Sequence, residues 1–205
     1  MRLVKGRLKM DKVPKPEFLD KVILEKRREK LKEAYATLES GVFMQGEIMT
    51  FERREILDLF SLMLPTSFNV MDERLKTVKY TGKFAPSLVL SSEDLSTDLG
   101  FSEFVDHKPK ESVTQMAQDV KEVLEGNPFT FDFQEIVSLK DVEGCYFQFF
   151  QTTLDTDMFH IMAFVRMSGQ MMHISFNCVS DLDTMMWETT VVQMLESIKN
   201  YEKRK

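Results

Sequence analysis

Cysteine is scarce in this sequence of 205 residues, which contains only Cys145 and Cys178. Both lie inside apolar, strand-like segments and lack the CxxC spacing of a redox pair, so we interpret them as buried thiols. A redox pair is the alternative. The first residues also lack the apolar segment of a secretory signal, so we expect a cytoplasmic protein without disulfide bonds.

Long hydrophobic runs and an excess of positive charge are also missing. No segment approaches the roughly 18 apolar residues of a membrane-spanning helix, so we expect no transmembrane segment. The net charge is −6, which gives the whole chain no electrostatic reason to bind nucleic acid. The charge is uneven, because residues 1–32 carry twelve Lys and Arg against five Asp and Glu, a net +7, and the remainder carries −13. A basic segment therefore precedes an acidic body.

The signature motifs of common enzymes are absent as well. The sequence contains no GxxxxGK[ST], GxGxxG or GxSxG motif. His107 lies in a polar segment, whereas His160 and His173 lie on one face of adjacent predicted strands without facing each other. A zinc site needs more converging ligands than this pattern provides. We therefore expect no catalytic residues, no metal and no cofactor.

Two acidic groups are the remaining candidates for cation binding or acid–base chemistry. The first contains Glu93, Asp94 and Asp98, and the second contains Asp181 and Asp183. Because Asp and Ser favour turns and helix N-termini, we interpret the first group as part of a turn between strands and the second as a helix cap.

Helical patterns occur in three places. Residues 17–39 are rich in helix formers and precede Gly41, residues 111–125 carry an apolar stripe that ends at Gly126, and residues 181–201 carry a third pattern. Pro14 and Pro16 disfavour a helix before the first of these. We therefore predict a basic arm over residues 1–16, an N-terminal helix over 17–41 and an α/β domain over 42–205.

Strand patterns fill most of the remaining chain. We predict one or two strands before Pro65, short strands in KTVKYTG, PSLVLSSED and STDLGFSEFVD, and a three-strand meander over about 144–179. A turn at Ser168 and Gly169 pairs residues whose numbers sum to 337, and a turn at Asp155 and Thr156 pairs residues whose numbers sum to 311. The second register places Phe150 opposite Ile161. Both faces of the meander contain large apolar side chains, so both need covering by helices. We predict an α+β fold, a three-layer α/β/α sandwich with an antiparallel sheet.

The segments LMLPTSFNVM, VKYTGKFAPSLVLSSED and MMHISFNCVSDLDTMMWETTVVQMLESI, taken in this order of elements, resemble the PsbP-like family. That group includes a photosystem oxygen-evolving subunit, a Ran-binding nuclear import factor, the DcrB lipoproteins and the Eag secretion chaperones. The resemblance covers about residues 46–198 and implies the PsbP-like fold. No catalytic residue set defines the family, so the resemblance implies no activity. The Eag members shield apolar helices of secreted cargo.

The second face of the meander is the candidate binding surface. The sequence contains fifteen methionines, and flexible thioethers line adaptable binding surfaces as well as irregular cores. We expect Met158, Met162, Met171 and Met185 to be exposed, and the N-terminal helix to cover this face or to leave it to a partner. The predicted partner-binding residues are Phe147, Phe149, Met158, His160, Met162, Phe164, Arg166, Met171 and His173.

The resulting hypothesis is a non-enzymatic protein-binding module, an adaptor or chaperone that holds an apolar peptide or helix of a partner, or a second copy of the chain, on this face. The alternative is a small enzyme or a small-ligand-binding protein with a pocket on the same face. A third hypothesis is that the basic arm binds an anionic surface.

Overall fold

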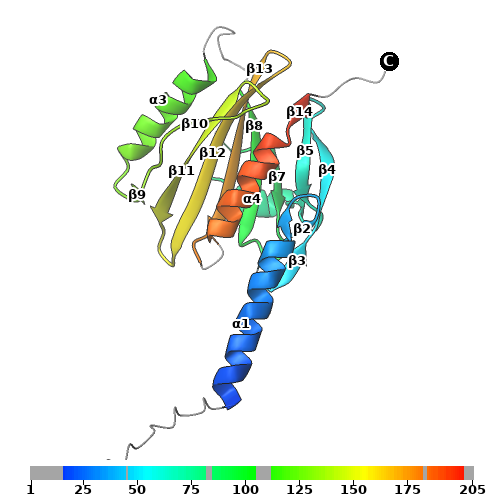
Figure 1. Cartoon of the computed structure of the whole chain (residues 1–205). Coiled ribbons are helices and arrows are strands. Elements are labelled where there is room, and N and C mark those ends of the chain that lie inside the picture. Colours follow the sequence, from blue (N-terminus) through cyan, green and yellow to red (C-terminus); the bar gives the residue numbers. More distant parts are fainter. Residues whose placement is uncertain (1–15, 45, 82–84, 105–111, 182–183, 201–205) are drawn as a thin grey trace, which may run out of the picture.

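The computed structural model describes residues 16–44, 46–81, 85–104, 112–181 and 184–200. Most of the predicted basic arm, together with His107, lies outside these residues. The N-terminal helix α1 runs over Pro16–Ala34 and projects away from the body (Figure 1). It ends before Glu39, contrary to the prediction, because the chain turns into strand pairing: Phe43 donates its N–H to the Tyr35 carbonyl (2.9 Å). The division into arm, helix and domain stays a prediction.

Three short strands follow α1 and form a small antiparallel sheet. They are β1 (Ala36–Thr37), β2 (Gly41–Met44) and β3 (Glu47–Met49). Gly41 has a φ of +88°, and a Cβ at this position would lie 3.0 Å from the Met49 carbonyl oxygen. This glycine therefore begins β2 and does not cap the preceding helix.

One antiparallel sheet organises the described part of the body, with eight strands in the order β10-β11-β12-β13-β8-β7-β6 and with β9 beside β11. Their bounds are β6 (Asn69–Val70), β7 (Leu88–Ser91), β8 (Thr97–Glu103), β9 (Thr130–Phe131), β10 (Val137–Ser138), β11 (Gly144–Thr152), β12 (Asp157–Met167) and β13 (Gln170–Val179).

The register of the predicted meander is partly confirmed. Strands β12 and β13 pair with residue numbers that sum to 337, so His160 faces Asn177. Strands β11 and β12 pair residues whose numbers sum to 309, so Phe150 faces Phe159. The predicted pairing, in which the numbers sum to 311, is wrong. The connecting loop holds four residues, 153–156, where a two-residue turn was predicted. A shift of two residues preserves the alternation of side chains, so every residue keeps its predicted face.

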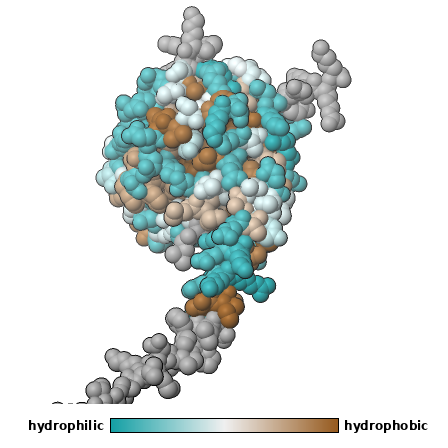
Figure 2. Space-filling view, viewed as in Figure 1, coloured by the Kyte–Doolittle hydropathy of each residue, from teal (hydrophilic) through white to brown (hydrophobic). Residues whose placement is uncertain are grey.

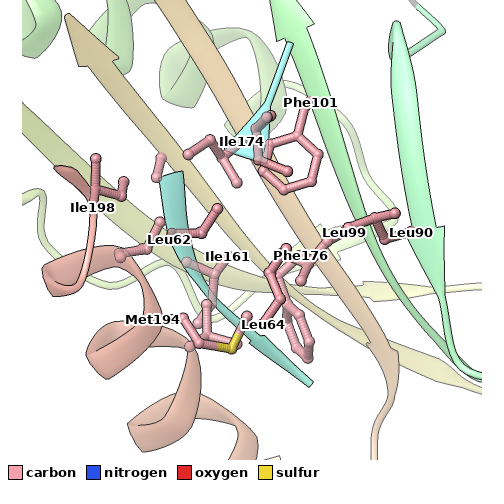
Figure 3. Packing of buried hydrophobic residues seen from close by; sticks show 14 of the residues in the cluster. Leu62, Leu64, Leu90, Leu99, Phe101, Ile161, Ile174, Phe176, Met194 and Ile198 are labelled. Carbon is pink, nitrogen blue, oxygen red and sulfur yellow. The ribbon is translucent and has the colours of Figure 1, made fainter. Parts of the chain in front are cut away.

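The main core covers the first face of this sheet, the face that carries Ile161, Ala163 and Phe176. Helix α4 (Thr184–Glu196) lies there beside a three-stranded sheet of β14 (Lys199–Asn200), β5 (Phe60–Pro65) and β4 (Phe51–Ile56). Figure 3 shows Leu62, Met194 and Ile198 meeting Ile161 and Phe176 of the large sheet. Burying each such side chain contributes about 1.5 to 3 kcal/mol, which makes this face the principal source of stability.

Helix α3 (Val113–Glu125) lies on the second face, so the sheet separates it from α4 (Figure 1). The Ser112 hydroxyl caps α3 by accepting the Gln115 N–H (3.0 Å). Pro86 also lies close to this face, because a Cβ on Gly100 of β8 would come within 2.7 Å of its Cγ. The predicted three-layer α+β architecture with an antiparallel sheet is confirmed.

Further element predictions are wrong. The helix predicted over residues 181–201 ends at Glu196, because Lys199 and Asn200 pair with β5. The segment predicted as a strand in KTVKYTG belongs to helix α2 (Glu73–Lys79), and Asp72 caps this helix by accepting the Arg74 N–H (2.9 Å). Residues 41–65 form four strands where one or two were predicted, because Gly41, Gly46 and the left-handed pair Leu57 and Asp58 introduce additional turns.

Candidate functional site

Four of the nine predicted binding residues are buried beneath α3. Phe147, Phe149, Phe164 and Met171 form a cluster with Cys145 and with the apolar stripe of the helix. Met171 was expected to be exposed, and this is wrong because β13 places it under α3. The N-terminal helix does not cover this face, as α1 projects from the opposite side of the sheet (Figure 1). A partner therefore reaches these four side chains only when α3 moves.

The other five predicted residues surround this buried cluster and are partly buried. Met158 and Met162 are half-buried, and Met162 packs against the cluster. Arg166 donates from Nε to Glu143 at 2.8 Å. The expectation that Met185 is exposed is confirmed, but it belongs to α4 and thus to the other side of the sheet. The role of all nine residues in partner binding stays a prediction.

His173 lies in apolar surroundings at one end of this face. Its ring stacks on Phe164 at 5.1 Å between centroids and lies 6.2 Å from the ring of Phe104. Its Nε2 is buried, and no described residue forms a hydrogen bond with it. Burial lowers the pKa of His173 to about 4, so the ring is neutral at pH 7.

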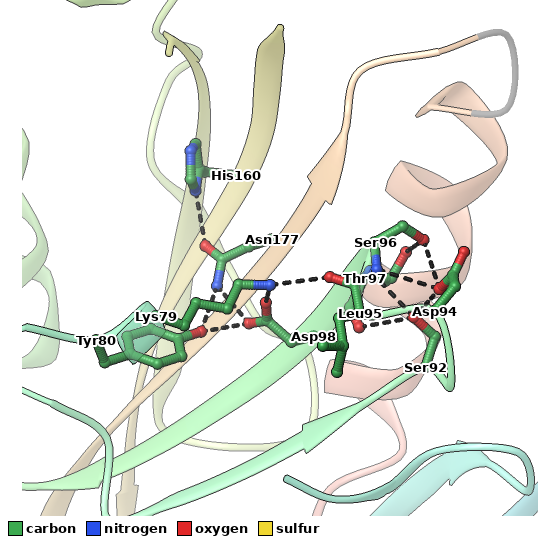
Figure 4. A network of polar contacts seen from close by, with 10 residues as sticks. All are labelled: Lys79, Tyr80, Ser92, Asp94, Leu95, Ser96, Thr97, Asp98, His160 and Asn177. Carbon is green, nitrogen blue, oxygen red and sulfur yellow. Dashed lines mark hydrogen bonds and ion pairs between the residues drawn. The ribbon is translucent and has the colours of Figure 1, made fainter. Parts of the chain in front are cut away.

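A polar network occupies the other end of the same face, where it links α2 to β8, β12 and β13 (Figure 4). Asp98 on β8 is fully buried. Its Oδ2 lies 2.6 Å from Lys79 Nζ, and its Oδ1 accepts hydrogen bonds from the Asn177 amide (2.7 Å) and from the Tyr80 hydroxyl. The buried carboxylate is therefore surrounded by donors, which is the condition for a charge to be tolerated inside a protein.

This network determines the tautomer of His160. Because the Asp98 carboxylate accepts from Asn177 Nδ2, the Asn177 Oδ1 atom points to His160 Nδ1 at 2.7 Å. An amide oxygen only accepts, so His160 carries its proton on Nδ1 and has a lone pair on Nε2. No described residue donates to this buried nitrogen. Burial lowers the pKa of His160, although the bond to Asn177 and the charge of Asp98 oppose the shift.

Tyr80 completes the network. Its hydroxyl donates to Asp98 and accepts from Asn177 Nδ2 (3.1 Å). Burial, followed by the charge of Asp98, raises the pKa of Tyr80 well above its usual range, so the phenol remains protonated. A protonated phenol that is linked through Asn177 to a neutral imidazole can orient hydrogen bonds, but it supplies no strong base.

The sequence interpretation missed Lys79, Tyr80, Asp98 and Asn177 as parts of one cluster. Asp94 does form the predicted turn, because its Oδ1 accepts from the Ser92 hydroxyl (2.7 Å) and from the Ser96 N–H (3.1 Å). Asp98 was assigned to the same turn but lies within β8. The alternation of side chains along β8 could have identified this cluster, because it places Asp98 and Gly100 on the same sheet face as His160.

A separate hollow of about 370 Å³ opens beside the small N-terminal sheet. Among its lining residues only Glu47 is titratable, and none is a cysteine or histidine, so it offers no acid–base or nucleophilic pair. The described lining residues are Met44, Glu47, Ile48, Met49, Thr50, Thr66 and Ser67.

Metal ligands do not converge anywhere in the described part of the chain, where no three His, Cys, Asp or Glu side chains are placed to hold an ion. Both cysteines are buried, as predicted. They lie on opposite faces of the sheet, since Cys145 belongs to the α3 cluster and Cys178 to the main core. The alternation of β11 and β13 thus separates the two thiols.

Several solved structures are similar to the chain. A cyanobacterial PsbP protein (CyanoP) from Synechocystis sp. PCC 6803 matches with a TM-score of 0.46 and 13% identity over 78% of this chain and 98% of that chain. LpqN, described as involved in cell envelope biogenesis of Mycobacterium tuberculosis, matches with a TM-score of 0.44 and 10% identity over 76% and 87%. A protein of unknown function from Pseudomonas aeruginosa matches with a TM-score of 0.40 and 8% identity over 72% and 94%.

A PsbP protein is thus among the similar structures. At these scores the similarity concerns the coarse arrangement of the sheet and helices, and nothing about function follows from it. Neither a family model nor a curated protein matches the chain. Among the described helices none has both the length and the apolar character that crossing a membrane requires.

Proposed function

We propose that the chain is a non-enzymatic protein-binding module in which α3 is a displaceable cover for the Phe-rich second face of the sheet. One observation supports this most: α3 is attached through a small apolar cluster of its own, which the sheet separates from the main core. Elements with few buried contacts open at lower free energy than the core does. Displacement of α3 uncovers the part of Phe147, Phe149 and Phe164 that faces the helix. Phe133 remains stacked on Phe149 and Phe104 on Phe164.

The surface under α3 fits an apolar helix of a partner. Three of the α3 side chains, Val113, Met116 and Ala117, are buried against it, and Val120 and Leu124 are half-buried. The opposite side of α3 is exposed and is polar except for Val123. A partner helix with the same apolar spacing could replace α3 at the cost of one weak hydrogen bond, from the Cys145 thiol to the Val113 carbonyl, because the rest of this part of the sheet presents hydrocarbon.

Cys145, which lies under α3, allows the helix to be tied to the sheet by a reversible disulfide bond. Cys145 Sγ lies 3.5 Å from the Val113 carbonyl oxygen. In Val113→Cys, oxidation is expected to tie α3 to β11, whereas reduction releases it. Val113→Ser is the matched control, since it has a side chain of similar size and cannot form the bond.

The binding experiment uses a fluorescent synthetic peptide with the sequence of residues 112–126. We expect the reduced Val113→Cys protein to bind it, seen as a rise in fluorescence anisotropy, and the oxidised protein not to bind it. Hydrogen exchange should be faster for α3 than for α4. Absence of peptide binding in both redox states, combined with equal protection of α3 and α4, would identify the cluster as ordinary core and overturn the proposal.

A small-ligand-binding site at the His160 end of the same face is the second candidate. It is favoured by the His160 Nε2 lone pair, which faces no described donor although its tautomer is held by Asn177 and Asp98. A thermal-shift screen with Zn²⁺, nucleotides and lysophospholipids tests it. A saturable shift that His160→Ala abolishes supports this candidate, and identical melting in every condition opposes it.

A further inference from the structure

Helix α1 presents apolar side chains that nothing in the described chain covers. Ile23 is 62% exposed and Leu24 58% exposed. Figure 2 shows hydrophobic side chains gathered toward the outer part of the projecting helix, followed by a hydrophilic stretch nearer the body. The next turn contains Lys26, Arg27 and Arg28 in succession. With Glu25 and Glu29 counted, residues 21–32 carry six Lys and Arg against two carboxylates, a net charge of +4. An apolar pair with a basic border is typical of a surface that contacts a partner.

A second exposed apolar patch lies at the β9 corner of the large sheet. Phe129 is 61% exposed and Leu154 fully exposed. The Thr152 N–H donates to the Phe129 carbonyl (2.8 Å), which brings the β9 strand beside the loop that holds Leu154. Phe131, also exposed, stacks on Phe150 at 5.7 Å and belongs to the same corner. We call Phe129, Phe131 and Leu154 the corner patch.

The corner patch has an acidic border, in contrast to α1. Residues 126–139 and 150–165, which carry the patch, contain four carboxylates, those of Asp132, Glu135, Asp155 and Asp157, and no Lys or Arg. The basic turn of α1 and this acidic border are complementary in charge, and each adjoins an exposed apolar group. Complementary borders of this kind select the partner and orient it.

We propose that the exposed pair of α1 in one copy of the chain docks on the corner patch of another copy, so that the protein assembles head to tail. The two surfaces differ, so the interface is heterologous, and a docked pair retains one unoccupied patch on the first copy and one unoccupied helix on the second. Such an interface continues into chains or closes into rings. It leaves the face beneath α3 unused, so this inference goes beyond the proposed function and can fail independently of it.

Two double variants test the docking. Ile23→Asp/Leu24→Asp removes the helix surface, and Phe129→Asp/Leu154→Asp removes the patch. All four side chains are exposed, so the fold should be retained, which far-UV circular dichroism and thermal melting check. The matched control is Val78→Asp/Val123→Asp, which introduces the same charge at two other exposed apolar positions.

Sedimentation velocity over a range of concentrations gives the readout. We expect the wild type and the control to form species larger than a dimer, and each double variant to remain a monomer. An equimolar mixture of the two variants should form a dimer and nothing larger. The variant with the altered patch keeps an intact helix, which docks on the intact patch of the other variant, and no intact surface is then left for a third copy. Raising the salt concentration about tenfold should weaken the association, since it shortens the Debye length about threefold.

Other results would overturn the proposal. A wild type that is monomeric throughout shows that α1 and the patch do not bind each other. A mixture that stays monomeric although the wild type associates shows a different interface. Flotation of a monomeric wild type with vesicles of phosphatidylcholine and phosphatidylserine, lost in Ile23→Asp/Leu24→Asp, would show that α1 contacts an anionic membrane instead.

Discussion

Lys79 Nζ lies 2.6 Å from Asp98 Oδ2, and this ion pair fastens the C-terminal end of α2 to strand β8 in the large sheet. The Asp98 side chain is fully buried, whereas that of Lys79 is one-third exposed. The pair thus joins a surface helix that buries none of its own residues to the interior.

Replacing Lys79 by a neutral residue should therefore destabilise the fold. Lys79→Met leaves the buried carboxylate with Tyr80 and Asn177 alone, and we expect a loss of about 3 kcal/mol in the free energy of unfolding. Lys76→Met is the control, because its partner Glu73 is largely exposed, and it should cost less than about 1 kcal/mol. Urea denaturation measures both. Equal losses in the two variants would show that the Asp98 pair contributes no more than a surface pair.

The burial of Phe149 predicts a structural effect for its substitution. Phe149→Ala should lower the free energy of unfolding by about 3 to 5 kcal/mol, because it opens a cavity under α3, and Phe149→Asp should lower it further, because it buries an unpaired charge. Phe129→Ala, at an exposed phenylalanine, should change stability by less than about 1 kcal/mol. Denaturant titration followed by tryptophan fluorescence checks this, since Trp187 lies in the main core. A stable Phe149→Asp protein would contradict the described packing of α3.

His173 predicts a loss of stability in mild acid. Its folded pKa of about 4 lies below the unfolded value of 6.5, so the unfolded state binds the proton more tightly. The stability that depends on a neutral His173 is fully present above pH 6.5 and is lost as the pH falls from 6.5 to 4. At pH 5 the loss should be about 2 kcal/mol relative to pH 7.

His173→Phe keeps an aromatic ring between Phe164 and Phe104 but does not titrate. Its free energy of unfolding should fall less between pH 7 and pH 5 than that of the wild type, by the amount that His173 contributes. His160→Phe is the comparison for the other buried imidazole, whose pKa is also lowered. Parallel pH profiles for the wild type and His173→Phe would show that His173 is accessible to water in the native state.

The two cysteines should report on different parts of the fold. Burial raises the pKa of Cys145 to about 11 and that of Cys178 to about 12, so neither is a reactive thiolate at pH 8. Cys145 lies under α3, so in Cys178→Ser it should react with a thiol reagent at the rate at which α3 opens. Cys178 lies in the main core, so in Cys145→Ser it should react only on global unfolding. Equal rates for the two thiols would argue against independent opening of α3.

Much of the fold could be predicted because the deciding pattern is local. The alternation of β12 and β13 around Ser168 and Gly169 assigned each residue to a face, and the apolar stripe of residues 113–124 identified α3. The β11–β12 register was wrong by two residues because the length of the loop between Thr152 and Asp157 depends on hydrogen bonds that the sequence does not display. Helix α2 was missed because its seven residues hold too little periodicity to be told from a strand.

The candidate site depended on contacts across long sequence distances. Sequence alone determined that both sheet faces are apolar and that Phe147, Phe149 and Phe164 share one of them, because side chains alternate along any strand. Only the tertiary structure decided that α3 covers that face while α1 projects outward. It also brought Tyr80, Asp98 and Asn177 together, since strand order and helix docking are set by the packing of the whole chain and not by any one segment.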